Sequence, residues 1–199
     1  MRKTHCTVIA AGVLALVAFS PAFGQEAETG PVAVPQYSLG DQTFCINAGL
    51  FIPMFFMSWT PSVAPTQLSL GGMGSIQWQA YLAPQIRIGG ELGALFALSP
   101  NTNFLFMADL TAKISYVFTV YPFEIPIYLG AGASLVRYQD SQTIDPLLKP
   151  GASFYWIFNS SWSFGLNVVY WWDMQFSAVP EQSRVGNFLE ITLSALYHF

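Results

Sequence analysis

Four charged residues share one spacing on two neighbouring apolar segments of the chain. Arg87 and Glu91 stand four positions apart, and Asp109 and Lys113 repeat that spacing on the next segment. In an extended strand, side chains four positions apart point to the same face. Charges that are enclosed by apolar walls must be paired or hydrated. The sequence therefore predicts an interior ion-pair network among these four residues, and Glu190 is expected to point into the same interior.

Residues suited to catalysis or metal binding are scarce. Beyond residue 24 the chain has one histidine, His198, and one cysteine, Cys45. Nucleophilic catalysis needs a base beside the nucleophile, and a single cysteine cannot form an intramolecular disulfide. We therefore expect no enzyme, no cofactor and no metal site, and we interpret Cys45 as a small half-buried strand residue.

Alternating apolar and polar residues predict the elements that hold these side chains. Eight segments with this period of two are separated by turn signals. Their polar faces would point inward and their aliphatic and aromatic faces outward. A polar loop is expected over residues 138–148. The predicted strands cover residues 43–55, 67–82, 86–98, 104–120, 125–137, 149–158, 162–174 and 186–199.

Composition indicates that the apolar face of each strand meets lipid. Hydrophobic residues make up 53% of the chain and charged residues 9%, whereas a soluble domain has about 25% charged residues. Beyond residue 24, no apolar run reaches the roughly 18 residues that a transmembrane helix needs. Because lipid tolerates no open sheet edge, the sequence predicts an all-β fold, an eight-stranded antiparallel up-and-down transmembrane β-barrel. An even strand number puts both barrel termini on the periplasmic side.

The N-terminal residues indicate export. Arg2 and Lys3 precede an apolar run of 12 residues, Val8–Phe19, which is typical of a signal peptide. We predict a signal peptide over residues 1–24, a flexible periplasmic leader over 25–42 and the barrel over 43–199. Without the signal peptide, five basic residues face 11 acidic ones, a net charge of about −6. No basic patch is present, so nucleic-acid binding has no support.

Aromatic residues gather near the predicted strand ends. Their rings suit the headgroup level of a membrane, where one edge is wet and the other apolar. We interpret them as girdles, with ligand stacking as the alternative. The set comprises Trp59, Trp78, Tyr81, Tyr116, Phe118, Tyr121, Trp156, Phe158, Trp162, Tyr170, Trp171 and Trp172.

The segment that follows the first predicted strand is almost wholly apolar. Methionine adapts well to varied apolar ligands, and several methionines belong to this region. We predict a hydrophobic pocket at the outer end of the barrel; alternatively, these residues face lipid or pack under the first loop. The predicted pocket residues are Phe51, Met54, Phe55, Met57, Trp59, Met73 and Met107.

The chain resembles the small outer-membrane barrel families OmpW, OmpX and the membrane domain of OmpA. The resemblance rests on the strand count, on the alternation, on residues 126–133 and on the terminal Phe199. The apolar first loop favours the OmpW type, which implies that small hydrophobic molecules pass sideways into the membrane. The ending with Tyr197 and Phe199 resembles the assembly signal of such barrels. It implies a bacterial outer-membrane location, with outer-membrane lipid and the barrel-assembly machinery as partners.

Several functions stay open. The first is a narrow pore or a pocket for small apolar solutes, in which the charged network either blocks flow or gates passage. The second is a structural or adhesive surface barrel that acts through its loops, although these are short and weakly charged. The third is a soluble lipocalin-like barrel whose apolar faces line a ligand cavity. An outer-leaflet enzyme is not expected, because His198 would lie at the periplasmic rim.

Overall fold

The computed structural model describes residues 37–58, 63–99, 104–138, 141–177 and 183–199. The predicted signal peptide, most of the predicted leader and Trp59 lie outside these residues. In the described part of the chain, no helix is long and apolar enough to cross a membrane. The strands there are β1 (Gln42–Ser58), β2 (Val63–Pro65), β3 (Gly71–Ala83), β4 (Ile86–Leu98), β5 (Phe104–Val120), β6 (Phe123–Tyr138), β7 (Ser141–Ile157), β8 (Trp162–Gln175) and β9 (Arg184–His198).

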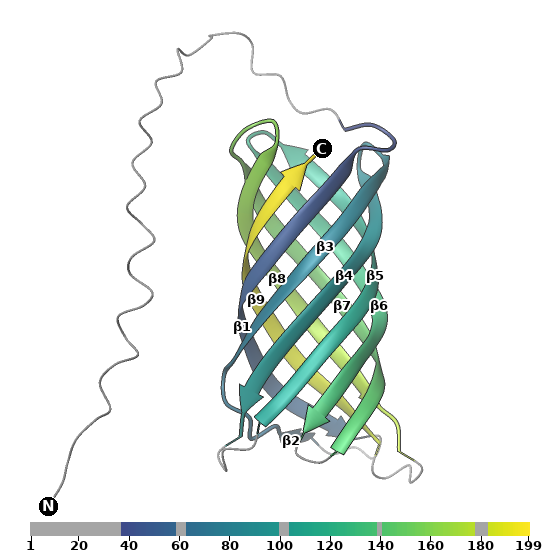
Figure 1. The fold of residues 1–199 in the computed structure, drawn as a ribbon, viewed down its shortest axis with the longest axis vertical. Coiled ribbons are helices and arrows are strands. Elements are labelled where there is room, and N and C mark those ends of the chain that lie inside the picture. The colour runs from purple at the N-terminus through teal and green to yellow at the C-terminus, as the bar shows by residue number, and fades with distance from the viewer. Residues whose placement is uncertain (1–36, 59–62, 100–103, 139–140, 178–182) are drawn as a thin grey trace, which may run out of the picture. The chain divides into compact units, whose positions relative to one another are not determined.

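The strands form one sheet that closes on itself. β1 pairs antiparallel with β3 and with β9, and the strands from β3 to β9 pair antiparallel in chain order. The short strand β2 also pairs with β1, from Met57↔Val63 to Phe55↔Pro65. In the described residues the closed wall therefore has eight long strands, which Figure 1 shows tilted around the barrel. The predicted eight-stranded antiparallel barrel is confirmed.

The barrel has two distinct ends. β1 begins and β9 ends together, where Gln42 and Phe199 exchange backbone hydrogen bonds of 2.9 and 3.0 Å. We call this the terminal end; it lies at the top of Figure 1. The opposite end, where β1, β4, β6 and β8 finish, is the loop end. Tight turns at 84–85, 121–122 and 158–161 join strands at the terminal end.

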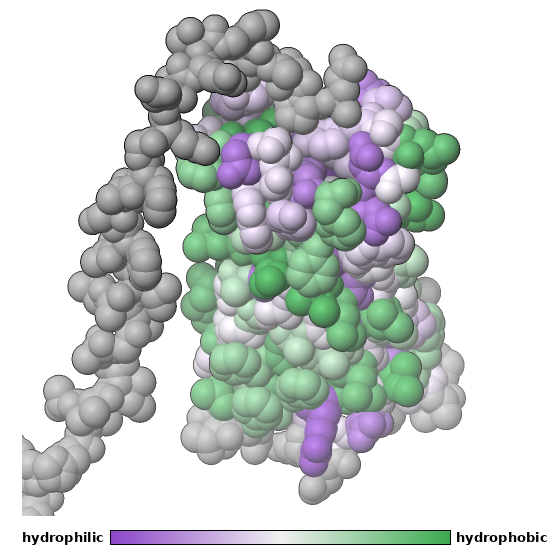
Figure 2. All heavy atoms as spheres, turned by 45° about the horizontal axis from the view of Figure 1, so that its top comes forward, coloured by the Kyte–Doolittle hydropathy of each residue, from purple (hydrophilic) through white to green (hydrophobic). Residues whose placement is uncertain are grey.

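Side chains alternate between the lumen and the outer wall. In β5, every second residue from Leu105 to Val117 is buried, and those between are exposed or half-exposed. The outward set includes Leu110, which is 66% exposed, and Figure 2 shows hydrophobic residues over the wall below the polar terminal end. Water does not tolerate an apolar surface of this extent, whereas a bilayer does. The lipocalin-like alternative is wrong, because polar and charged side chains line the interior.

β7 begins well before its predicted start. The sequence predicts a polar loop over residues 138–148, but the described strand runs from Ser141 and pairs with β6 as far as Tyr138↔Ser141. The polar character of these residues is the basis of that prediction, yet most of them belong to a strand, which also contains two prolines. Pro146 lies beyond the last β7–β8 pair, Leu147↔Asp173, and Pro150 lies where that ladder is interrupted. A proline is tolerated at such positions because no ladder partner needs its N–H.

A β-bulge in β1 changes which side chains face the lumen. The register against β9 shifts between Pro53 and Phe55, so that Met54 has no partner. One extra residue reverses the period-two alternation beyond it. Phe56 consequently pairs with Gly186 and points inward. The neighbouring strand β3 begins at Gly71 and not at the predicted residue 67. Leu68, in the segment before β3, packs against the buried apolar side chains of the lumen.

Residues 37–41, which the sequence assigns to a flexible leader, contact the terminal end. Gly40 N–H donates to the Tyr81 carbonyl at 3.0 Å, and Tyr81 N–H donates to the Asp41 carbonyl at 2.8 Å. Gly40 has a φ of 97°, which favours glycine. β1 then starts at Gln42, one residue before the predicted boundary. The described end of the leader is thus part of the barrel rim.

Candidate functional site: the filled lumen and a pocket at the loop end

Five charged side chains meet in the middle of the lumen, and we call them the central ion cluster: Glu91, Asp109, Lys113, Lys149 and Glu190. The Lys149 ammonium group contacts a carboxylate oxygen of Glu91, Asp109 Oδ2 at 3.1 Å and Glu190 Oε2 at 3.7 Å. Lys113 Nζ lies 2.5 Å from Glu91 Oε2. Lys149 therefore connects acidic groups from three other strands across the lumen.

Aromatic rings complete the surroundings of both ammonium groups. Lys113 Nζ lies 4.1 Å from the centroid of Tyr128, and Lys149 Nζ lies 4.0 Å from that of Trp171. The indole N–H of Trp171 donates to Glu190 Oε2 at 2.9 Å. Ion pairs without water are tolerated only when geometry and hydrogen bonds offset desolvation. Rings and carboxylates supply that compensation here.

Glycines provide the space for these large side chains. A Cβ at Gly151 would lie 2.6 Å from the ring atom Cε2 of Tyr128, and a Cβ at Gly93 would collide with the Asp109 carboxylate. Both glycines lie on strands in the lumen wall. Their lack of a side chain lets the central ion cluster fill the barrel.

An apolar layer covers the cluster on the side of the loop end. On one side of this layer, Trp171 contacts Lys149 of the central ion cluster. On the other side, Met107 and Phe188 line a cavity at the loop end. The side chains of the layer are 0–7% exposed. Between the loop end and the terminal end, the lumen is therefore occupied by side chains. The layer comprises Phe51, Met73, Leu95, Met107, Leu147, Trp171 and Phe188.

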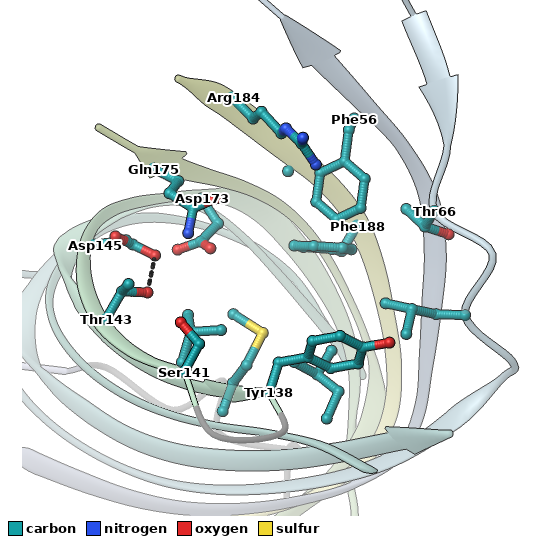
Figure 3. A pocket seen from close by; sticks show the side chains of 15 residues that line it. Phe56, Thr66, Tyr138, Ser141, Thr143, Asp145, Asp173, Gln175, Arg184 and Phe188 are labelled. Atoms are coloured by element: carbon teal, nitrogen blue, oxygen red, sulfur yellow. Dashed lines mark hydrogen bonds between the residues drawn. The ribbon is translucent and has the colours of Figure 1, made fainter. Parts of the chain in front are cut away.

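Above the apolar layer, the barrel opens into a cavity of about 320 Å³, the loop-end pocket. Its walls come from β1, the segment before β3, and strands β5 to β9. Figure 3 shows Asp145 and Asp173 on one side of the pocket and the rings of Phe56, Phe188 and Tyr138 on the other. The pocket thus combines an acidic wall, an aromatic wall and an apolar floor.

Each aspartate of the pocket uses a neighbouring hydroxyl. Thr143 Oγ1 donates to Asp145 Oδ2 at 2.9 Å. The Ser134 hydroxyl donates to Asp173 Oδ1 and lies 3.4 Å from the backbone carbonyl of Asp145. Ser134 therefore lies between the Asp173 carboxylate and the backbone of Asp145. Asp145 is 4% exposed and Asp173 is 6% exposed, so both are largely buried in the pocket wall.

Four of the five residues predicted for the interior network meet, and Arg87 does not. Its guanidinium group lies 5.4 Å from the Tyr81 ring centroid and forms no ion pair with a described residue. Four residues of a strand span about 13 Å. Arg87 and Glu91 therefore share a face without touching, and the same holds for Asp109 and Lys113.

The terminal end of the lumen is closed by stacked rings. The ring centroid of Tyr37 lies 4.5 Å from that of Tyr81 and 5.1 Å from that of His198. Burial, and then the charge of Glu124, raises the pKa of the Tyr37 hydroxyl. His198 lies at the predicted rim, but it is only 9% exposed and its Nε2 lies 3.2 Å from Ser163 Oγ. It is therefore packed rather than hydrated.

The predicted hydrophobic pocket is located differently in the structure. Met107 lines the loop-end pocket, whereas Phe51 and Met73 lie in the apolar layer. Met54 and Met57 are 43% and 45% exposed on the outer wall. The bulge at Met54 turns Phe56 inward in place of Phe55, which is half-buried outside the pocket lining. Trp59 lies outside the described residues.

Four functional residues escaped the sequence interpretation: Lys149, Trp171, Asp145 and Asp173. Asp145 lies in the predicted loop and Lys149 at its edge, so the predicted alternation assigns neither residue to a face. The sequence assigns Trp171 and Tyr81 to the aromatic girdle, but both side chains are fully buried. Asp173 lies two positions after Trp171 on β8, so both side chains point to the same side of the strand. The alternation along β8 therefore indicates that Asp173 points into the lumen.

The fold and the lumen define a small transmembrane β-barrel protein of the outer-membrane type. One protein-family model matches residues 24–197, so the chain belongs to the family that this model defines. A protein of Borreliella burgdorferi is 27% identical over 176 residues, 77% of this chain and 81% of its own length. A protein of Treponema pallidum is 24% identical over 131 residues, 65% of this chain. The chain spans 60% of the length of this second relative.

Solved structures support the same fold class. Neisserial surface protein A has a TM-score of 0.57 at 11% identity, covering 80% of this chain and 97% of that chain. A major outer membrane protein from Thermus thermophilus has a TM-score of 0.53 at 16% identity, with coverages of 81% and 100%. The outer membrane protein OprG from Pseudomonas aeruginosa has a TM-score of 0.51 at 12% identity, with coverages of 82% and 97%. The predicted outer-membrane barrel class is confirmed, and the OmpW-like type stays a prediction.

Proposed function

We propose that this outer-membrane barrel binds small amphiphilic molecules in the loop-end pocket, with the pocket facing the cell exterior and both barrel termini in the periplasm. One observation carries the proposal. A cavity of about 320 Å³, with an apolar floor and polar groups on its wall, lies above a lumen that side chains fill. Ligand pockets of small molecules have volumes of roughly 300–1,000 Å³ and this mixture of surfaces.

The chemistry of the pocket favours a ligand with an apolar body. Leu68, Leu105, Met107 and Val136 line it together with the rings of Phe56 and Phe188. Methionine and aromatic side chains accommodate varied apolar shapes. Transfer sideways into the membrane, as in the OmpW type, would be a further step after binding.

The filled lumen favours binding over flow along the barrel axis. Trp171, Lys149 and Glu190 are all 0% exposed at mid-lumen. A pore would require these side chains to separate, which would leave buried charges without partners. The alternative of a loop-mediated adhesin depends on segments that lie largely outside the described residues, and no described contact favours it.

The binding test uses the protein in lipid nanodiscs, with 2-phenylethanol and 2-phenylethylamine as probes. We expect at least one probe to bind with a dissociation constant in the millimolar range or below, as roughly nine heavy atoms allow. Val136→Trp should abolish this binding because the indole fills the pocket. Leu135→Trp places the same indole on the outer wall and should leave binding intact. Calorimetry that detects neither probe, relative to empty nanodiscs, would refute the proposal.

The orientation is tested separately by cysteine labelling of intact cells. Gln142 is exposed at the loop end and Ser160 is exposed in a turn at the terminal end. Cys45 is only 2% exposed and should not react. A membrane-impermeant maleimide should label Gln142→Cys in intact cells and Ser160→Cys only after lysis. The reverse pattern would show that the pocket faces the periplasm.

A further inference from the structure

The two aspartates of the loop-end pocket form no ion pair with a cationic side chain among the described residues. The ion pairs found among the described residues all belong to the central ion cluster. Asp145 and Asp173 each accept a hydrogen bond on one oxygen, from Thr143 and Ser134 respectively. The second oxygen of each has no hydrogen-bond partner among the described residues and belongs to a side chain that lines the cavity.

Two neighbouring carboxylates in a largely buried wall repel each other and lose hydration. Ser134 Oγ contacts the Asp173 carboxylate and the backbone carbonyl of Asp145, and both aspartates are more than nine-tenths buried. A cation between them would remove the repulsion and restore the interactions lost with water. In the central ion cluster Lys149 supplies this cation, whereas the described lining of the pocket has no ammonium group beside its aspartates.

Among the described residues that line the pocket, the one basic side chain lies away from the aspartates. Arg184 is exposed and stands at the rim on the side of Phe56, as Figure 3 shows. It forms no ion pair with Asp145 or Asp173 among the described contacts. A ligand with a positive group can therefore reach the aspartates without displacing a protein cation.

The opposite wall fits the rest of such a ligand. The rings of Phe56, Phe188 and Tyr138 face the cavity across from the aspartates. Aromatic faces attract organic cations and pack against apolar groups. From this juxtaposition we infer that the loop-end pocket selects small organic cations, such as primary amines with an aromatic or aliphatic body, through Asp145 and Asp173. The inference rests on the proposed binding function and adds the charge of the ligand.

The experiment compares probes that share one body and differ in charge. 2-Phenylethylamine, 2-phenylethanol and 3-phenylpropionate are titrated into the nanodisc-embedded protein at low salt. We expect the amine to bind at least tenfold more tightly than the alcohol, a difference of about 1.4 kcal/mol, and the carboxylate to bind more weakly than the alcohol. Asp173→Asn and Asp145→Asn should remove most of the preference for the amine.

A matched variant separates local from general charge effects. Asp41→Asn removes the same charge at the terminal end, where Asp41 accepts a hydrogen bond from Ser38 at 2.7 Å. It should leave the preference for the amine unchanged. Equal affinity for amine and alcohol would overturn the cation inference while leaving the proposed pocket intact. Tighter binding of calcium ions than of the amine at the aspartates would also overturn it. Failure of every probe would refute both proposals.

Discussion

Lys149 is the residue whose loss should most disturb the barrel interior. Its ammonium group contacts Glu91, Asp109 and Glu190. Lys149→Met keeps the length of the side chain and an apolar contact with Trp171, but it removes the charge. Three carboxylates then face a single ammonium group, that of Lys113.

The expected loss of stability follows from the burial of these groups. Lys149 and its partners have side chains that are 0% exposed, so water does not replace the lost cation. Removing one partner of a buried ion pair destabilises a protein by about 3–5 kcal/mol. We expect Lys149→Met to lower the free energy of unfolding by that amount. Glu190→Gln in the same background should recover about 1 kcal/mol, because one uncompensated charge is removed.

Urea unfolding in lipid vesicles, followed by tryptophan fluorescence, measures these changes. Band shifts of unboiled samples on denaturing gels give an independent measure of the folded fraction. Arg137→Met serves as the control, because this exposed residue forms no ion pair in the described barrel. It should change stability by less than about 0.5 kcal/mol. A Lys149→Met barrel within 1 kcal/mol of the wild type would refute the role given to Lys149, on the scale of a buried pair.

Three further outcomes are expected. Gly151→Ala should destabilise the barrel by about 1–3 kcal/mol, because the new Cβ would collide with the Tyr128 ring. Gly74→Ala should be tolerated, because its new Cβ would lie 3.5 Å from its nearest neighbour. Equal urea midpoints for the two variants would contradict this prediction. Phe199→Ala should reduce assembly in cells more than Phe158→Ala, although the two residues are almost equally exposed, at 58% and 59%. Equal folded fractions of the two variants on unboiled gels would argue against an assembly signal at Phe199. The wild-type protein should show no steady conductance in planar bilayers, since side chains fill its lumen; regular channel openings would disprove this.

Most of the barrel could be predicted from the sequence because alternation is a local property. Each strand must present apolar side chains to lipid and polar ones to the lumen. Apolar and polar residues therefore alternate along β4 and β5, and this alternation can be recognised in the sequence. The prediction failed where a local signal depended on its neighbours. The polar residues 138–148 indicated a loop, but most of them lie in β7, and Pro146 and Pro150 lie where β8 needs no hydrogen-bond donor. The bulge at Met54 likewise depends on the register against β9.

The loop-end pocket could be predicted only in part. An apolar site near the end of the first strand was expected, and Met107 does line the cavity. Asp145 and Asp173 come from separate strands, and the registers of β6, β7 and β8 bring both residues beside Ser134. No spacing along the chain encodes that proximity, so the acidic wall became visible only in three dimensions.

The sequence by itself determined the class of protein and the face on which most strand residues lie, because a period of two in a lipid-facing sheet leaves few alternatives. It also placed Glu91, Asp109, Lys113 and Glu190 inside the barrel. The tertiary structure decided which of these charges meet, since closure of β1 on β9 sets the height of every residue around the lumen. That closure brings Lys149 to three acidic groups across the lumen, leaves Arg87 apart, and creates the pocket above them.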